Sequence, residues 1–374
     1  MSGIVISLCC NDVSVAGGQQ NGQSDLTLGA TAVTGDNDPG AAAETKAEAE
    51  TATGLEAQTK AGVAAAETEA AADRGDAVAG QDHRARLTSI VADALRAAHS
   101  VTDAGQQSLA LVAVAVALMD ADPARAGRLV VDAERVAQSV RGESARSLAL
   151  AAVAGPLTVA DPGRAQRAVE SITGDRAKAQ ALAAVAAALA ASDPGRAAGL
   201  IAEAHELAET ITGPGQKAPA LAAVAEALAM IDSDQAERLA RSIPEPPLRV
   251  MALTTLARAV APGDPDRAAR LMADTERAVQ SISGASLRAP ALAAVAGALA
   301  ASDPGRAARL IADAERLAQA IPDPNGRASA LAAVADGLAA TDPDRAERLA
   351  QSITSAGARA LALAAVAKAL AVGL

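Results

Sequence analysis

Two alternating patterns of apolar and polar residues fill the chain from residue 82 to its end. In the segment DPGRAARLIADAERLAQAI, residues 303–321, apolar side chains recur at steps of three and four, and charged side chains occupy the positions between them. This spacing predicts an amphipathic helix with one apolar face. The segment ALAAVADGLAA, residues 330–340, is apolar nearly all round. It predicts a second helix that is buried between its neighbours.

An aspartate marks the start of each amphipathic segment. Proline follows it everywhere except at Asp232, where Ser233 follows. Asp is a favourable N-cap, and Pro is favourable at the first helical position. The markers are separated by 39, 32, 39, 32, 39 and 39 residues, which is typical of stacked two-helix repeats. The seven markers are Asp122, Asp161, Asp193, Asp232, Asp264, Asp303 and Asp342.

The amphipathic segments come in two lengths that differ by seven residues. Those that begin at Asp161, Asp232 and Asp342 are short, and the other four are long. Seven residues make two helical turns, about 10.5 Å at 1.5 Å per residue. A change of two turns keeps every later side chain within about 20° of its former direction. Long and short helices can therefore belong to the same stack.

These patterns predict an all-α protein, an α-solenoid of about sixteen antiparallel helices in two-helix repeats of 32 or 39 residues, over residues 82–374. Hydrophobic residues make up 51% of the chain, but none is Phe, Tyr or Trp. Small side chains suit helices that pack closely in single file, so we expect an elongated array. Residues 1–81 are acidic, of low complexity and without an apolar stripe. They predict a disordered tail.

Negative charge is concentrated in front of the repeats. Residues 1–82 carry thirteen acidic and three basic side chains, a charge of −10, whereas the remaining 292 carry thirty-one and thirty, a charge of −1. A nearly neutral repeat region without aromatic residues lacks the basic surface and the stacking groups typical of nucleic-acid binding. The purely apolar segments are shorter than the roughly 20 residues of a membrane span. We expect a cytoplasmic protein that binds no membrane, and the composition disfavours binding of nucleic acid.

The sequence shows no motif that would carry catalysis or hold a cofactor. It has no Gly-rich phosphate loop and no nucleophile elbow, and its three histidines are far apart. The adjacent pair Cys9 and Cys10 cannot form a disulfide framework. We therefore predict no catalytic residue, no metal and no cofactor, and a protein that is not an enzyme.

The turn within ALAASDPGRAARLIADA, residues 298–314, resembles the turn between the two helices of a tetratricopeptide-type repeat, with Ala307 as the small residue that begins the second helix. Residues 82–374 are similar to Ala-rich α-solenoids of high-GC bacteria, and HEAT-like arrays overlap in repeat length. The aromatic positions of the tetratricopeptide pattern are absent. The resemblance implies an interaction or sensing region, which some such bacterial proteins join to an effector enzyme.

One position of the apolar segment, the x in ALAAVAxAL, varies most between units. Its occupants are Val116, Gly155, Ala187, Glu226, Arg258, Gly297, Asp336 and Lys368. In a tetratricopeptide-type stack the first helix of each pair lines the concave face. The charged occupants Glu226, Arg258, Asp336 and Lys368 are therefore candidates for binding a partner. The alternative is that x is the one loosely packed position of a buried helix.

Two further registers of the repeat are basic. An arginine lies three residues after each marker except Asp232, where Gln235 replaces it, and a basic residue stands near the start of seven apolar segments. The first set is Arg125, Arg164, Arg196, Arg267, Arg306 and Arg345; the second is Arg146, Lys178, Lys217, Arg249, Arg288, Arg327 and Arg359. We expect the first set to pair with an Asp within or between units, and the second to offset the carbonyls that end the preceding helix. A rail of cations that binds phosphates or acidic peptides is the alternative.

These features favour a non-enzymatic scaffold that binds a protein or peptide along a surface of helical repeats. The alternatives are the sensing or regulatory region of a bacterial effector whose enzymatic domain is absent from this sequence, and a helical-repeat RNA binder. The chain ends on an apolar segment with Val366, Leu370, Val372 and Leu374, without a polar capping helix after it. Solenoids normally need such a cap, so we expect either self-association through the C-terminal helix or a longer native protein.

Overall fold

The computed structural model describes residues 81–372, and every regular element in that range is a helix. A first helix spans residues 81–99, and fifteen more follow it, which confirms the predicted all-α repeat fold with sixteen helices. The tail predicted for residues 1–81 lies outside the described residues, apart from its last one. The fifteen helices are α3 (Ala104–Leu118), α4 (Pro123–Gln138), α5 (Glu143–Ala160), α6 (Pro162–Glu170), α7 (Asp175–Leu189), α8 (Pro194–Thr210), α9 (Pro214–Leu228), α10 (Ser233–Ser242), α11 (Pro246–Val260), α12 (Pro265–Gln280), α13 (Ala285–Leu299), α14 (Pro304–Gln319), α15 (Pro324–Ala339), α16 (Pro343–Ser352) and α17 (Ala356–Ala371).

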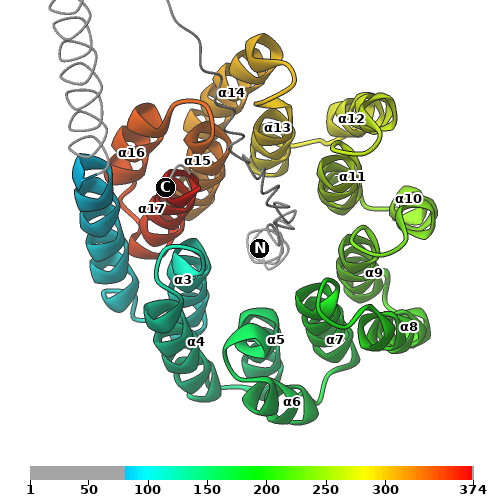
Figure 1. Ribbon diagram of the computed structural model, residues 1–374. Helices are drawn as coiled ribbons and strands as arrows, with labels where there is room; N and C mark the ends of the chain where they lie inside the picture. The colour runs from blue at the N-terminus through cyan, green and yellow to red at the C-terminus, as the bar shows by residue number, and fades with distance from the viewer. Residues whose placement is uncertain (1–80, 373–374) are drawn as a thin grey trace, which may run out of the picture. The chain divides into compact units, whose positions relative to one another are not determined.

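The helices from residue 85 onward belong to one compact unit, and they form an inner and an outer layer (Figure 1). The inner layer holds the odd-numbered helices, which are the apolar segments of the sequence. The outer layer holds the first helix and the even-numbered helices, which are the amphipathic segments. Each inner helix packs against the next inner helix along the chain, and α17 packs against α3. The inner layer is therefore a closed ring of eight helices.

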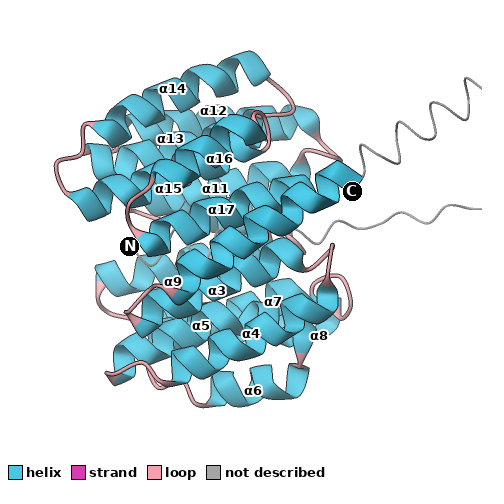
Figure 2. Ribbon diagram, turned by 90° about the vertical axis from the view of Figure 1, so that its left-hand side faces the viewer, coloured by secondary structure: helices cyan, strands magenta, loops and turns pink. Residues whose placement is uncertain are grey.

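This closure corrects two expectations from the sequence. The array is not an elongated stack with two free ends, because its last unit packs on its first (Figure 2). Most of the apolar face of the C-terminal helix is not uncovered either, since α3 packs on it and Val366 and Leu370 are buried, whereas Val372 after its end is 71% exposed. The argument for self-association through α17 thereby loses its physical basis.

The start of each outer helix follows the predicted capping chemistry. All seven marker aspartates accept a hydrogen bond from the backbone N–H three residues further on, at 2.9 to 3.0 Å. Proline occupies the first turn of every outer helix from α4 to α16 except α10. The two predicted lengths are also confirmed. Helices α6, α10 and α16 have 9, 10 and 10 residues, whereas α4, α8, α12 and α14 have 16 or 17.

The inner helices approach one another so closely that small residues are required between them. A methyl group on Gly337 of α15 would lie 2.6 Å from the carbonyl oxygen of Ala293 in α13. A methyl group on Gly155 of α5 would lie 3.1 Å from the carbonyl oxygen of Ala184 in α7. The rest of the core is filled by alanine, valine, leucine and isoleucine, with one methionine. This close approach accounts for the absence of aromatic residues in a ring of this size.

Candidate functional site

Four of the six arginines that follow a marker aspartate join neighbouring outer helices. Arg164 pairs with Glu134 at 2.7 Å, Arg267 with Glu237 at 2.7 Å, Arg345 with Glu315 at 2.5 Å, and Arg306 with Glu276. The partner that all four share is a glutamate of the preceding unit, whereas an aspartate was expected; Arg267 alone also contacts an aspartate, Asp234, at 2.7 Å. In every pair the glutamate and the arginine are 30 residues apart in the sequence, whether the glutamate lies on a long or a short helix. The spacing is constant because the seven extra residues of a long helix lie between its marker aspartate and its glutamate. These four arginines are structural joints between units.

The second basic register also has the structural role expected from the sequence at four positions. The side chains of Lys217, Arg249, Arg327 and Arg359 donate to a backbone carbonyl at the end of the preceding outer helix, at 2.8 to 3.2 Å. A cation at a helix C-terminus offsets its unpaired carbonyls. These side chains therefore stabilise the turns that connect each outer helix to the inner helix that follows it.

The variable position of the inner helices brings charge to the inside of the ring. Arg258 of α11 and Asp336 of α15 are exposed, and Lys368 of α17 is half-buried. Helix α15 packs against α13 and α17 on its two sides and against α14 and α16 behind it. The exposed face of Asp336 can therefore only look toward the interior of the ring, and the same argument places Arg258, since α11 is flanked by α9 and α13 and backed by α10 and α12.

Three of the four candidate charges act on one another. The surrounding protein desolvates the Asp336 carboxyl, although its side chain is exposed, and this raises its pKa; the positive charges of Lys368 and Arg258 act in the opposite direction. Helices α11, α15 and α17 thus place two cations within electrostatic reach of one carboxyl, although α13 lies between α11 and α15.

Glu226 of α9 is in a different situation. Its side chain is only 3% exposed, and its Oε2 atom has no hydrogen-bond partner among the described residues. Burial raises the pKa of this carboxyl to about 8, so it is largely protonated at neutral pH. No contact of the described residues joins it to Arg258, Asp336 or Lys368. The structure brings together three of the four candidates and leaves Glu226 apart.

Packing governs the variable position at some uncharged units. Gly155 meets α7 so closely that a larger residue would need the backbone to move, and a methyl group on Gly297 would lie 3.5 Å from the Cα of Gly337. The two interpretations of this position therefore apply to different units. It is a packing position at Gly155, and a position open to the interior at Arg258 and Asp336.

Sequence reasoning missed two cavities on the outer layer. One, of about 340 Å³, lies between α10 and α12, and the other, of about 390 Å³, lies between α16, α17 and the first helix. Both occur where a short outer helix is followed around the ring by a long one. One residue of the first cavity, Arg241, could have been noticed in the sequence. The equivalent position of every other repeat unit has a residue other than arginine.

Across residues 81–372, no three or more His, Cys, Asp or Glu side chains are grouped so that they could hold a metal ion. None of the helices described in this range is long and apolar enough to cross a membrane.

No family model matches this chain, and no curated protein matches it. Among solved structures, the crystal structure of Ton1535 from Thermococcus onnurineus NA1 is similar over 76% of this chain and 99% of that chain, with 16% sequence identity and a TM-score of 0.31. We draw no conclusion on function from a similarity of this size.

Proposed function

We propose that this protein is a non-enzymatic scaffold whose ring of helical repeats binds a protein or peptide partner through charged side chains on the inner helices. The observation that carries the proposal is the placement of Arg258, Asp336 and Lys368. These residues come from three helices of an otherwise alanine- and leucine-rich layer, and their charges act on one another.

The repeat itself does not require these charges. At the same position other units have Val116, Gly155, Ala187 and Gly297, and their helices pack into the same ring. Desolvating a charge costs free energy unless a partner compensates it. A side chain that carries this cost without a role in packing is a candidate for binding a ligand.

The charges also indicate the chemistry of the partner. Arg258 and Lys368 offer N–H donors to a carboxylate, and Asp336 offers an acceptor to an amine or a guanidinium group. A peptide segment with both acidic and basic side chains meets both requirements. A segment of this kind fits the proposed binding of a protein or peptide.

Selection from a peptide display library tests this proposal. The full chain is used as bait beside a variant with Arg258→Ala, Asp336→Asn and Lys368→Ala. A matched control changes three exposed charges of α14, with Arg309→Ala, Asp313→Asn and Arg316→Ala. We expect mixed-charge peptides to be enriched on the wild type and the control, and to bind the interior variant about tenfold more weakly or worse. Equal enrichment on all three baits, or none on the wild type, would contradict the proposal.

A further inference from the structure

A second charged surface lies on the outer layer, in the cavity between α10 and α12. Its charged lining consists of four arginines and two acids, a net charge of +2. These residues are Glu237, Arg241, Arg267, Arg270, Asp274 and Arg277. The nearly neutral repeat region therefore concentrates positive charge at this groove.

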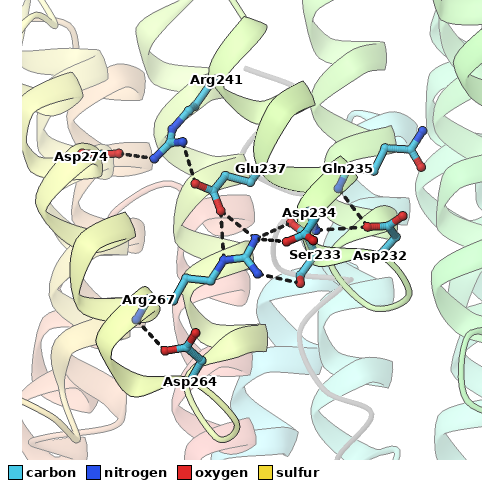
Figure 3. A network of polar contacts seen from close by, with 9 residues as sticks. All are labelled: Asp232, Ser233, Asp234, Gln235, Glu237, Arg241, Asp264, Arg267 and Asp274. Carbon is cyan, nitrogen blue, oxygen red and sulfur yellow. Dashed lines mark hydrogen bonds and ion pairs between the residues drawn. The ribbon is translucent and has the colours of Figure 1, made fainter.

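The two acids of the groove are each shared by two arginines, and Figure 3 shows the contacts of Arg241 and Arg267. Arg241 spans the groove, with its guanidinium 2.6 Å from Glu237 of its own helix and 2.7 Å from Asp274 of α12. Arg267 contacts Glu237 at 2.7 Å, and Arg277 contacts Asp274. The arginines of this groove thus already hold carboxylates in the geometry of charge-assisted hydrogen bonds.

Several donors of the groove are left for a further acid. Arg270 forms no hydrogen bond or ion pair with any described residue. The side chains of Arg241 and Arg277 are 52% and 75% exposed, and each guanidinium has five N–H groups. Arg267 is the exception, because Glu237, Asp234 and Ser233 occupy its donors. The groove therefore has unused donors on Arg241, Arg270 and Arg277.

The packing of the repeat does not require Arg241. The equivalent residues of the other units are His99, Gln138, Glu170, Glu209, Gln280, Gln319 and Gln351. Gln351 lines the second outer cavity, where Arg96, Arg359 and Asp93 are the only charged residues of the lining. On the first helix, Ser89 stands in the register of Arg270, but it is not part of the lining of that cavity. Each cavity lies between a short outer helix and the long one that follows it. The lining of the first cavity contains four arginines, and the lining of the second contains two.

We infer that the groove between α10 and α12 binds an acidic peptide segment of a partner protein, through side-chain carboxylates that accept from Arg241, Arg270 and Arg277. Charge complementarity supports this occupant, and the contacts of Glu237 and Asp274 show how carboxylates fit this set of arginines. This surface is independent of the interior charges of the proposed function.

Fluorescence anisotropy with a labelled peptide of alternating glutamate and alanine, applied to the full chain, tests the inference. A glutamine-for-glutamate peptide is the ligand control. We expect the acidic peptide alone to bind, and its affinity to fall at 0.5 M salt because these charges are exposed. Arg241→Gln and Arg270→Ser should each weaken binding about threefold to fivefold. These two changes introduce Gln and Ser, the residues that α16 and the first helix carry in the same two registers.

The protein supplies matched controls. Arg309→Ser changes the same register as Arg270, but on α14 and outside the groove, and should leave binding unchanged. Arg241→Lys keeps the charge and should retain more affinity than Arg241→Gln. The interior change Arg258→Ala should have no effect, which separates this inference from the proposed function. Thermal midpoints equal to that of the wild type show that the variants are folded.

Three results would overturn the inference. The first is no binding of the acidic peptide at millimolar concentration and low salt. The second is equal binding of the glutamine peptide, and the third is equal weakening by Arg309→Ser and Arg270→Ser. Displacement of the acidic peptide by a phosphoserine peptide at much lower concentration would assign the groove to phosphate and contradict the carboxylate assignment.

Discussion

Arg86 of the first helix donates two hydrogen bonds to the Glu347 carboxylate of α16, at 2.9 and 3.2 Å, although 261 residues separate them. Arg86 stands in the register of the joint arginines, as Arg306 does in α14, and Glu347 stands in the register of Glu315. The last unit thus meets the first through the same contact that joins Arg345 to Glu315 inside the array. The ring closes by repeating its own interface.

A double-mutant cycle tests whether the two joints are equivalent. We expect Arg86→Gln and Glu347→Gln to show a coupling free energy of up to about 1 kcal/mol, since both side chains are partly exposed. Arg345→Gln and Glu315→Gln should give a coupling of similar size. Urea unfolding of the single and double variants measures both. A coupling at the internal joint with none at the closing joint would show that the ring is open in solution.

The close approach of α13 and α15 predicts opposite effects for two glycine-to-alanine changes. In Gly337→Ala the new methyl group would meet the Ala293 carbonyl oxygen at 2.6 Å and Cδ1 of Ile311 at 3.0 Å, which should cost about 1–3 kcal/mol. In Gly199→Ala of α8 the methyl group has no neighbour within 4 Å, and the better helix propensity of alanine should stabilise the protein by up to about 1 kcal/mol. Thermal unfolding checks both, and a neutral Gly337→Ala would rule out this packing.

The buried Glu226 predicts a stability that depends on pH. Its pKa is raised from 4.5 to about 8 in the folded protein, so between these values the folded state keeps a proton that the unfolded state has lost. Its contribution to the free energy of unfolding therefore falls as pH rises from about 4.5 to about 8. Glu226→Gln removes this dependence, and should match the wild type at pH 5 but exceed it by about 2–4 kcal/mol at pH 9. Identical slopes of stability against pH for the two proteins would contradict the burial of this carboxyl.

The capping aspartates predict a difference between two conservative changes. Asp303 accepts a hydrogen bond from the backbone N–H of Arg306 at 2.9 Å. Asp303→Ala should lose about 1 kcal/mol of stability, and Asp303→Asn should lose little, because asparagine caps as well as aspartate. Urea denaturation of the two variants distinguishes capping from a general effect of charge, since a charge effect would make both changes equally damaging.

Much of the fold could be predicted from local patterns in the sequence. The Asp-Pro markers fix where the outer helices begin, and the seven-residue difference fixes which of them are short. Both are local properties, in which capping and helical periodicity decide the outcome. Closure could not be predicted in the same way, because it depends on the sum of small rotations between successive units. The signal that was missed is the presence of Arg86 and Glu347, the two halves of a joint, at opposite ends of the array.

The candidate site could be predicted only in part. The comparison of units identified the position of Arg258, Asp336 and Lys368, and the structure places Arg258 and Asp336 on the inner face of the ring. The comparison of units could not show that Glu226 differs from these three residues, because its burial depends on contacts between units. It also missed the groove of Arg241 and Arg270, because that groove forms only when α10 and α12 lie side by side.

Closure of the ring is the central claim, and a disulfide across the closing joint tests it most directly. A methyl group on Gly357 of α17 would lie 3.8 Å from Cγ2 of Val101, which precedes α3, so side chains at these two positions meet across the closing joint, as the two cysteines of a disulfide must. We expect Val101→Cys with Gly357→Cys, in a background with Cys9→Ser and Cys10→Ser, to form a cross-link within one chain at every protein concentration under oxidising conditions. A protein that stays uncross-linked, or that cross-links only between two chains, would contradict the closed ring.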